Sequence, residues 1–184
     1  MNVFEFNATK LRELHADVHS TYARRHEGKH SRKIRDRKGW TDWHEACERC
    51  RNSYDDLAFP GGLERAMALL KKKDNCIIEL SVQFLEADPW FYRSGYLKED
   101  IIRVLRQVPL SMDQRMRLQK VIVARIQSPN TPREFRWYCR LAPYVSDSNF
   151  ETYVATFAGQ SDSIQSWHAR WVVSQLRASG GLRR

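Results

Sequence analysis

The chain has 184 residues, which is enough for one well-buried domain with or without a short appendage. Apolar residues make up 42% of it and charged residues 29%, a globular composition that excludes a disordered chain. The formal net charge of +9 favours nucleic acid, an acidic protein or an anionic membrane as the partner, because each attracts a basic protein over long range.

Apolar residues recur at helical spacing along almost the whole chain. Leu11, Leu14 and Val18 mark a first helix, which we expect to begin near Asn7 or Thr9. Residues 3–6 alternate like a strand, but they have no partner strand and are left outside this helix. Caps, prolines and glycines set the other boundaries. They predict helices at residues 41–59, 63–73, 76–87, 96–108, 111–127, 133–145, 148–158 and 162–178.

The fold is therefore predicted to be all-α, with eight or nine helices in antiparallel pairs. These pairs would stack as a right-handed solenoid or as a compact bundle. At this architectural level, residues 41–178 resemble a HEAT-like or armadillo-like helical array, a resemblance that brings no site residues with it. The predicted domains are an N-terminal helix with a basic segment (1–40), a helical domain (41–178) and a flexible tail (179–184).

Residues 24–38 form the most basic stretch of the chain, with eight Lys or Arg against two acids. Apolar side chains nearly vanish there, and only Ile34 remains. Such a segment is typical of a polyanion-binding arm. The candidate nucleic-acid-binding residues in it are Arg24, Arg25, Lys29, Arg32, Lys33, Arg35, Arg37 and Lys38.

The same stretch contains a zinc-peptidase pattern, H-E-x-x-H, from His26 to His30. In such enzymes the two imidazoles bind zinc from one helix face and the glutamate, here Glu27, activates a water. The interior pair Gly28 and Lys29 weakens the helix and adds a cation beside the metal, and no third ligand stands out. A zinc-dependent hydrolase is therefore the least favoured function, and we predict no catalytic residue.

Other histidines and cysteines could also suggest metal. His15 and His19 lie one turn apart, which suits either a metal or hydrogen bonds at a helix edge, and we favour the second. Cys47 and Cys50 have the spacing of half a zinc site, with His44 just before them. The other two cysteines, Cys76 and Cys139, are single, distant and on apolar helix faces, so we expect all four to be core residues and predict no cofactor or metal.

The helix predicted at 133–145 supplies a second basic surface. Its buried side is predicted to be Phe135, Tyr138, Cys139, Ala142 and Val145. The opposite side then carries Arg133, Arg136, Trp137, Arg140 and Tyr144. Two interpretations stay open: these residues grip phosphates and stack bases, or Trp137 packs against a neighbouring helix and arginine stems cover the seam. Five further cations could extend this surface: Arg103, Arg106, Arg115, Arg117 and Lys120.

Together these features predict a non-enzymatic nucleic-acid-binding helical protein, a subunit or accessory factor of a nucleoprotein complex that binds DNA or RNA. The alternative is a protein-interaction adaptor whose basic surface docks on an acidic partner. We find neither a signal-peptide pattern nor an apolar run of membrane-spanning length, the longest being residues 121–124. We therefore expect a cytoplasmic protein with reduced thiols and no membrane partner.

Overall fold

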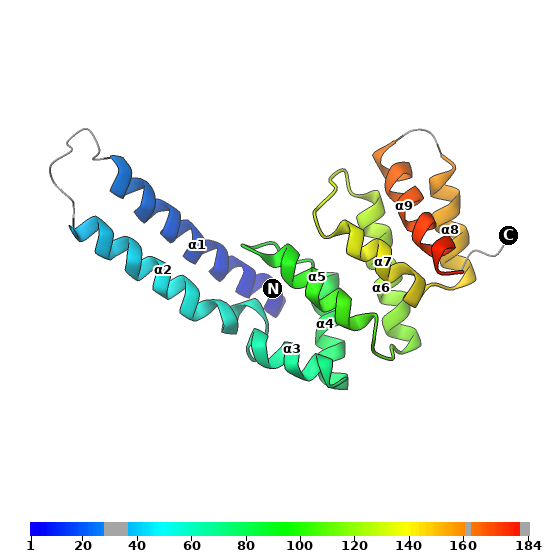
Figure 1. Ribbon diagram of the computed structural model, residues 1–184, viewed down its shortest axis with the longest axis horizontal. Coiled ribbons are helices and arrows are strands. Elements are labelled where there is room, and N and C mark those ends of the chain that lie inside the picture. Colours follow the sequence, from blue (N-terminus) through cyan, green and yellow to red (C-terminus); the bar gives the residue numbers. More distant parts are fainter. Residues whose placement is uncertain (28–36, 161–162, 181–184) are drawn as a thin grey trace. The chain divides into compact units, whose positions relative to one another are not determined.

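The computed structural model describes residues 1–27, 37–160 and 163–180, and over these ranges the chain is helical without a strand, as predicted (Figure 1). The helices in this described part are α1 Val3–Glu27, α2 Arg37–Ala58, α3 Leu63–Lys71, α4 Asn75–Ala87, α5 Ser94–Leu105, α6 Met112–Gln127, α7 Phe135–Val145, α8 Ser148–Ala158 and α9 Ile164–Ala178.

The chain divides into two compact units. Unit 1 comprises Met1–Ala68 and Pro89–Ser94, and unit 2 comprises Leu69–Asp88 and Gly95–Arg184. The division differs from the boundary expected at residue 40, because α2 packs along α1 and belongs to the same unit.

Helix α1 of unit 1 begins earlier than the sequence pattern indicates. The side-chain oxygen Oδ1 of Asn2 accepts hydrogen bonds from the backbone N–H groups of Phe4 (2.8 Å) and Glu5 (3.2 Å), which caps the helix. Phe4 is buried, and its ring centroid lies 5.8 Å from that of Phe59. The predicted start near Asn7 or Thr9 is therefore wrong, since the first turn is stabilised by a contact with a residue far along the chain.

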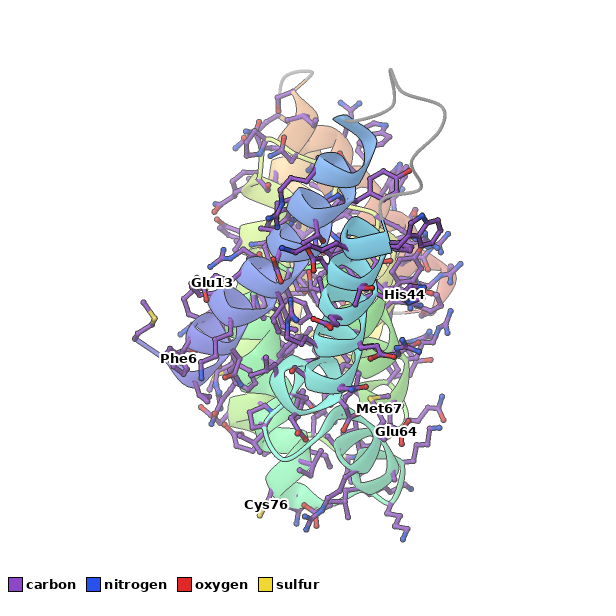
Figure 2. All side chains as sticks on the ribbon, turned by 90° about the vertical axis from the view of Figure 1, so that its left-hand side faces the viewer. Phe6, Glu13, His44, Glu64, Met67 and Cys76 are labelled. Carbon is purple, nitrogen blue, oxygen red and sulfur yellow. The ribbon has the colours of Figure 1, made fainter. Side chains whose placement is uncertain are left out.

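Helices α1 and α2 form an antiparallel hairpin. Ala8 and Leu11 on α1 and Ala46 on α2 are buried, and Arg49 pairs with Asp17 at 2.8 Å across the hairpin. The outer sides are exposed, as Figure 2 shows for Phe6 and Glu13 on α1 and His44 on α2. Helix α2 already begins at Arg37, so the cap predicted at Thr41 is wrong.

The predicted stop after α2 is present. Gly61 and Gly62 have φ values of +80° and +91°, a conformation that glycine adopts without strain. A Cβ on Gly62 would lie 2.9 Å from an Asp55 carboxylate oxygen. That carboxylate accepts a hydrogen bond from the backbone of Glu64 at 3.0 Å, which anchors the start of α3.

In unit 2, side chains directly before three helices cap them. Asp74 caps α4 by accepting from two backbone N–H groups, and Ser111 forms a capping box with Gln114 at α6. Asp147 caps α8. The sequence favours Thr131 as the cap of α7, but this helix has no side-chain cap, and the Thr131 hydroxyl lies 2.6 Å from Nε2 of the buried His168 instead.

The core of unit 2 is aromatic and aliphatic, with a buried charge cluster beside it. Phe84 and Leu85 of α4 and Tyr138 of α7 are fully buried. Lys98 is only 3% exposed; its ammonium lies 2.7 Å from Asp88 and 3.7 Å from Glu134. A buried cation needs such partners, because the removal of an unpaired charge from water costs on the order of several kcal/mol.

Candidate nucleic-acid interface

The inward side of α7 is the one that the sequence predicts. Its five members are all buried: Phe135, Tyr138, Cys139, Ala142 and Val145. Burial raises the pKa of the Cys139 thiol to about 12, so this cysteine stays a neutral core residue. The opposite side of α7 is thereby directed away from this core, together with its arginines.

Trp137 does not lie on that opposite side as an exposed ring. It is 8% exposed, and three guanidinium groups cover it, from Arg103, Arg136 and Arg140. Their Cζ atoms lie 4.4, 5.7 and 4.5 Å from the ring centroid, respectively. Of the two interpretations, the covered seam therefore describes Trp137, and a nucleobase has no access to this ring without displacing the arginines.

Other arginines of the same unit also rest on aromatic rings. The Cζ atom of Arg133 lies 4.1 Å from the ring centroid of Tyr96, and the guanidinium donates to the tyrosine hydroxyl. Arg106 lies 4.9 Å from the ring centroid of Tyr144 and also donates to its hydroxyl, at 3.3 Å. Stacking of this kind fixes the plane of a guanidinium and leaves most of its N–H groups at the edge free to bind an anion.

Few carboxylates neutralise these arginines. Glu99, itself 8% exposed, accepts from Arg103 at 2.5 Å and lies 3.9 Å from Arg136, and the exposed Asp100 accepts from Arg103 at 3.2 Å. Within the described residues, no carboxylate lies within 4.0 Å of Arg106, Arg133 or Arg140. This surface therefore keeps positive charge that its own unit does not compensate.

A groove between α7 and α9 adjoins the stacked arginines. Its volume is about 270 Å³, and its lining residues are Arg136, Cys139, Arg140, Trp171, Ser174 and Gln175. Trp171 is 39% exposed, and its ring centroid lies 4.3 Å from that of Trp167, which is 42% exposed. Exposed aromatic rings beside guanidinium groups are the combination found where proteins bind unpaired bases and their phosphates.

The sequence interpretation missed the α9 side of this groove. Trp167, Trp171 and Ser174 follow one another at spacings of four and three residues, opposite the buried stripe of α9. This spacing in the sequence could have predicted an exposed aromatic face on α9. The proximity of Trp171 to Arg140 could not have been predicted in this way, because it depends on how α7 packs against α9.

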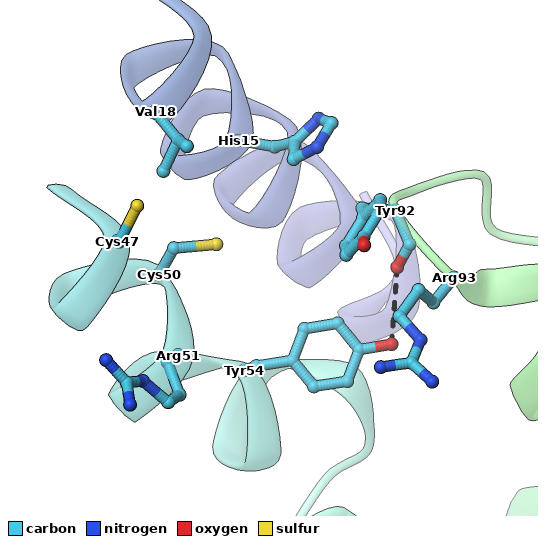
Figure 3. A pocket seen from close by; sticks show the side chains of 8 residues that line it. All are labelled: His15, Val18, Cys47, Cys50, Arg51, Tyr54, Tyr92 and Arg93. Atoms are coloured by element: carbon cyan, nitrogen blue, oxygen red, sulfur yellow. Dashed lines mark hydrogen bonds between the residues drawn. The ribbon is translucent and has the colours of Figure 1, made fainter. Parts of the chain in front are cut away.

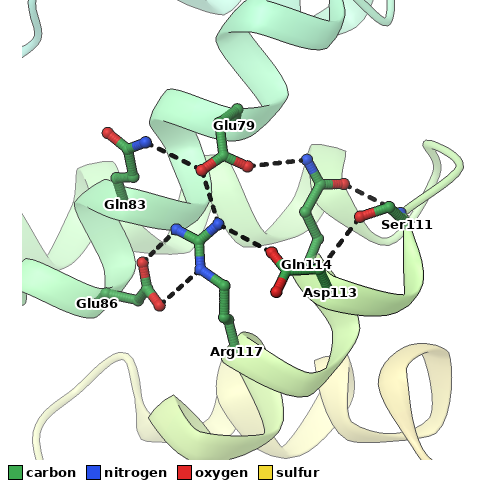
Figure 4. A network of polar contacts seen from close by, with 7 residues as sticks. All are labelled: Glu79, Gln83, Glu86, Ser111, Asp113, Gln114 and Arg117. Carbon is green, nitrogen blue, oxygen red and sulfur yellow. Dashed lines mark hydrogen bonds and ion pairs between the residues drawn. The ribbon is translucent and has the colours of Figure 1, made fainter.

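Not every basic residue of unit 2 is available in this way. Figure 4 shows Arg117 of α6 held by Glu79 (2.7 Å), Glu86 (2.5 Å) and Asp113 (3.3 Å). Hydrogen bonds to Glu86 and Glu79 hold the pKa of Arg117 above its ordinary value. Arg117 is therefore a structural residue of the α4–α6 contact, whereas Arg115 and Lys120 on the same helix are exposed.

Most of the basic segment lies outside the described residues. Arg24 and Lys38 are exposed. The described part excludes all of residues 28–36, which include Lys29, His30, Arg32, Lys33 and Arg35. It also excludes the side chains of Arg25, His26, Glu27 and Arg37. The H-E-x-x-H pattern therefore lies outside the described part as well.

The described ends of the hairpin that flank this segment carry an aromatic cluster. The ring centroid of Trp43 lies 6.0 Å from that of Tyr22 and 5.7 Å from that of Trp40. Tyr22 and Trp40 are 46% and 41% exposed. Both basic stretches predicted from the sequence are thus accompanied by accessible aromatic rings within their own unit.

The cysteines differ from the expectation of four core residues. Only Cys139 is buried; Cys76 is exposed, and Cys47 and Cys50 are half-buried. Asp74 caps α4 two residues before Cys76, which places this cysteine in the exposed first turn (Figure 2). Within the ranges that the structure describes, no three His, Cys, Asp or Glu side chains are arranged to hold a metal ion.

Comparisons with known proteins give no further assignment. No protein-family model, curated protein or solved structure matches the chain. No helix in the described part is both long and apolar enough to cross a lipid bilayer.

Proposed function

We propose that this protein binds nucleic acid through unit 2, with the basic segment at residues 24–38 as a further contact. The observation that carries the proposal is the α7–α9 groove, where Arg136 and Arg140 lie beside the exposed Trp171. We call Arg103, Arg133, Arg136, Arg140 and Trp171 the arginine–tryptophan surface.

The chemistry of this surface suits a phosphate-linked chain. A guanidinium group binds phosphate oxygens through two parallel N–H bonds, and such charge-assisted bonds are stronger than neutral ones. Stacking over Trp137 orients Arg136 and Arg140 before any ligand arrives. The exposed ring of Trp171 can then stack on a base, and a base is accessible for stacking only where it is unpaired. Single-stranded DNA or RNA is therefore the expected ligand.

A protein-interaction adaptor is the second candidate. It is favoured by three exposed apolar side chains on α9, namely Ile164 (42%), Trp167 (42%) and Trp171 (39%). An acidic protein would use the same arginines as a nucleic acid does. The two candidates differ in whether a polynucleotide alone is sufficient for binding.

The decisive experiment is a titration of labelled 20-mer oligonucleotides, both single-stranded and duplex, across a salt series. We expect tighter binding of the single strand and a steady loss of affinity as salt rises, because bound phosphates release counterions. The double variant Arg136→Gln/Arg140→Gln should weaken binding by about one to two orders of magnitude and reduce the salt slope by about 2. Absence of binding to either oligonucleotide at low salt would overturn the proposal.

The matched control removes the same charge elsewhere in unit 2. Arg115→Gln/Lys120→Gln changes two exposed cations of α6 that lie outside the groove. We expect it to leave affinity nearly unchanged. If both double variants weaken binding equally, net charge and not the arginine–tryptophan surface accounts for it.

A further inference from the structure

A half-open pocket in unit 1 is separate from the surface proposed above. It lies between α1, α2 and the segment Pro89–Ser94, and its volume is about 380 Å³ (Figure 3). The eight lining residues are His15, Val18, Cys47, Cys50, Arg51, Tyr54, Tyr92 and Arg93. This volume is within the range of small-molecule sites in proteins, which is roughly 300–1,000 Å³.

Contacts between its own residues hold the pocket in shape. The ring of Tyr92 stacks on His15, with centroids 4.5 Å apart and planes at 15°. The hydroxyl of Tyr54 donates to the backbone carbonyl of Tyr92 at 3.2 Å. These contacts join α1 and α2 to the segment that carries Tyr92, so the flat wall made by the rings of Tyr54 and Tyr92 exists before a ligand binds.

The charge of the lining is entirely positive. It contains the two guanidinium groups of Arg51 and Arg93 and no carboxylate. Burial, with a smaller effect of the neighbouring His19, lowers the pKa of His15, which favours its neutral form. Burial also raises the pKa of Cys50 and of Tyr54, so these two side chains are uncharged at neutral pH.

Arg93 has a backbone conformation that indicates a constrained position. Its φ of +65° lies in the left-handed region, which costs a non-glycine residue about 1–2 kcal/mol. Figure 3 shows its guanidinium group beside the Tyr54 hydroxyl, and its charge acts to lower the pKa of Tyr54 against the larger effect of burial. The Arg93 guanidinium thus supplies positive charge at the Tyr54 end of the aromatic wall.

We propose that this pocket binds a small organic anion with a flat apolar body, such as an aromatic carboxylate or sulfonate. The apolar body lies against Tyr54 and Tyr92 and beside Val18, and the anionic group is directed toward Arg93. The proposal does not depend on nucleic-acid binding, because every lining residue belongs to unit 1.

The test uses two fluorescent probes that differ in one group. Anilinonaphthalene sulfonate carries the anion, and N-phenyl-1-naphthylamine has the same ring system without it. The 184-residue protein is titrated with each probe, as wild type and as Arg93→Gly. Glycine accepts the positive φ without strain, so this variant removes the charge without straining the backbone. We expect it to weaken sulfonate binding about tenfold or more and to leave binding of the uncharged probe unchanged.

Lys73→Gly is the matched control. Lys73 also has a positive φ, +62°, and is exposed in unit 2 outside the pocket, so the substitution relieves the same strain and removes the same charge. We expect it to bind both probes as the wild type does. If Arg93→Gly keeps the wild-type affinity for the sulfonate, or if both glycine variants lose it equally, the assigned anion site is wrong.

A second variant tests the location of the apolar body. Figure 3 shows Cys50 on the α2 side of the pocket, and Cys50→Trp would fill it. We expect this variant to lose binding of both probes while the far-ultraviolet circular dichroism stays helical. Retention of both probes would place the dye elsewhere and overturn the proposal. Should the variant unfold, the comparison between Arg93→Gly and Lys73→Gly still decides the outcome.

Discussion

Arginines in two regions of unit 2 meet opposite surroundings. On α6, Arg117 is bound by carboxylates of Glu79, Glu86 and Asp113, so its charge is neutralised within the fold (Figure 4). On α7, Arg140 rests on the ring of Trp137, and no carboxylate of the described residues lies within 4.0 Å of it. A charge surplus in a sequence is therefore a poor guide to function until the partners of each cation are known. One region pairs its arginine with carboxylates of the fold, and the other leaves the charge of its arginine uncompensated.

This comparison predicts the largest change in stability at Trp137, the ring between the stacked arginines and the core of unit 2. Trp137→Ala should destabilise the protein by about 3–5 kcal/mol, because it removes a buried ring and the platform for three guanidinium groups. Denaturant unfolding measures this change. Trp171→Ala is the control on the same groove; since Trp171 is 39% exposed, we expect it to cost less than about 1 kcal/mol. Equal losses of stability would show that the two tryptophans do not differ in role.

The buried charge cluster should give the next largest effect. Asp88→Asn keeps the side-chain shape and tolerates the local φ of +45°, but it removes the charge that faces Lys98 (2.7 Å) and Arg125 (2.6 Å). Because Glu134 remains 3.7 Å from Lys98, we expect a loss of about 2–3 kcal/mol in the free energy of unfolding, less than for a fully isolated charge.

The control for that change is Asp100→Asn, which alters an exposed pair with Arg103 on α5. Its expected cost is under about 0.5 kcal/mol, since exposed ion pairs contribute little. A large loss for Asp100→Asn, or none for Asp88→Asn, would contradict the assignment of Asp88 as a structural partner of the buried lysine.

Trp171 should also affect the ligand itself. In the oligonucleotide titration, Trp171→Ala should weaken single-strand binding by about 1–2 kcal/mol and duplex binding by much less, because a stacked base is lost only where bases are unpaired. Trp90→Ala, at a 72% exposed tryptophan of unit 1, serves as the matched control. An identical loss of affinity for the single-stranded and the duplex oligonucleotide would indicate that Trp171 does not contact a base.

Arg117 and Arg140 can be compared directly by the same substitution. Arg117→Gln should lower the free energy of unfolding by about 1 kcal/mol, as three partly exposed carboxylates lose their shared cation, and should leave oligonucleotide affinity unchanged. Arg140→Gln should do the reverse, with a stability change within about 0.5 kcal/mol. The distinction between the two regions is lost if both variants change the same property.

The smallest expected effect is a dependence on pH. Hydrogen bonds, chiefly from Arg117, lower the pKa of Glu79 from its ordinary value of 4.5. A lowered folded-state pKa contributes stability above pH 4.5, and this contribution is lost as pH falls through the folded value. Because the site is partly exposed, we expect less than about 1 kcal/mol. The stabilities of wild type and Glu79→Gln, measured by urea unfolding, should differ at pH 6, and the difference should shrink as the pH falls below 4.5; a constant difference would contradict this origin.

The sequence was sufficient for features that local chemistry encodes. Asp74 and Ser111 cap helices because each bonds to backbone groups two or three residues away, which any single sequence displays. The start of α1 was missed because Phe4 is fixed by Phe59, a contact that is not visible in a short stretch. Within the described residues, helical structure was thus predictable except at residues 3–6, and boundaries only where a local cap exists.

The sequence predicts which arginines of α7 face away from the core, but not which other residues form the candidate site with them. Helical periodicity correctly separates the buried side of α7 from Arg136 and Arg140. It could not show that Trp137 is covered, because Arg103 of α5 supplies part of the cover. It also could not bring Trp171 to the groove, since that proximity arises from the packing of α9 against α7.

The stacked guanidinium groups over Trp137 have a thermodynamic consequence for association. A free arginine side chain loses about 2 kcal/mol of rotamer entropy when it is immobilised. Arg136 and Arg140 are already oriented in the folded protein, so part of that loss occurs during folding and not on binding. Calorimetry of oligonucleotide association should accordingly show a smaller unfavourable entropy than arginines on a mobile segment would give.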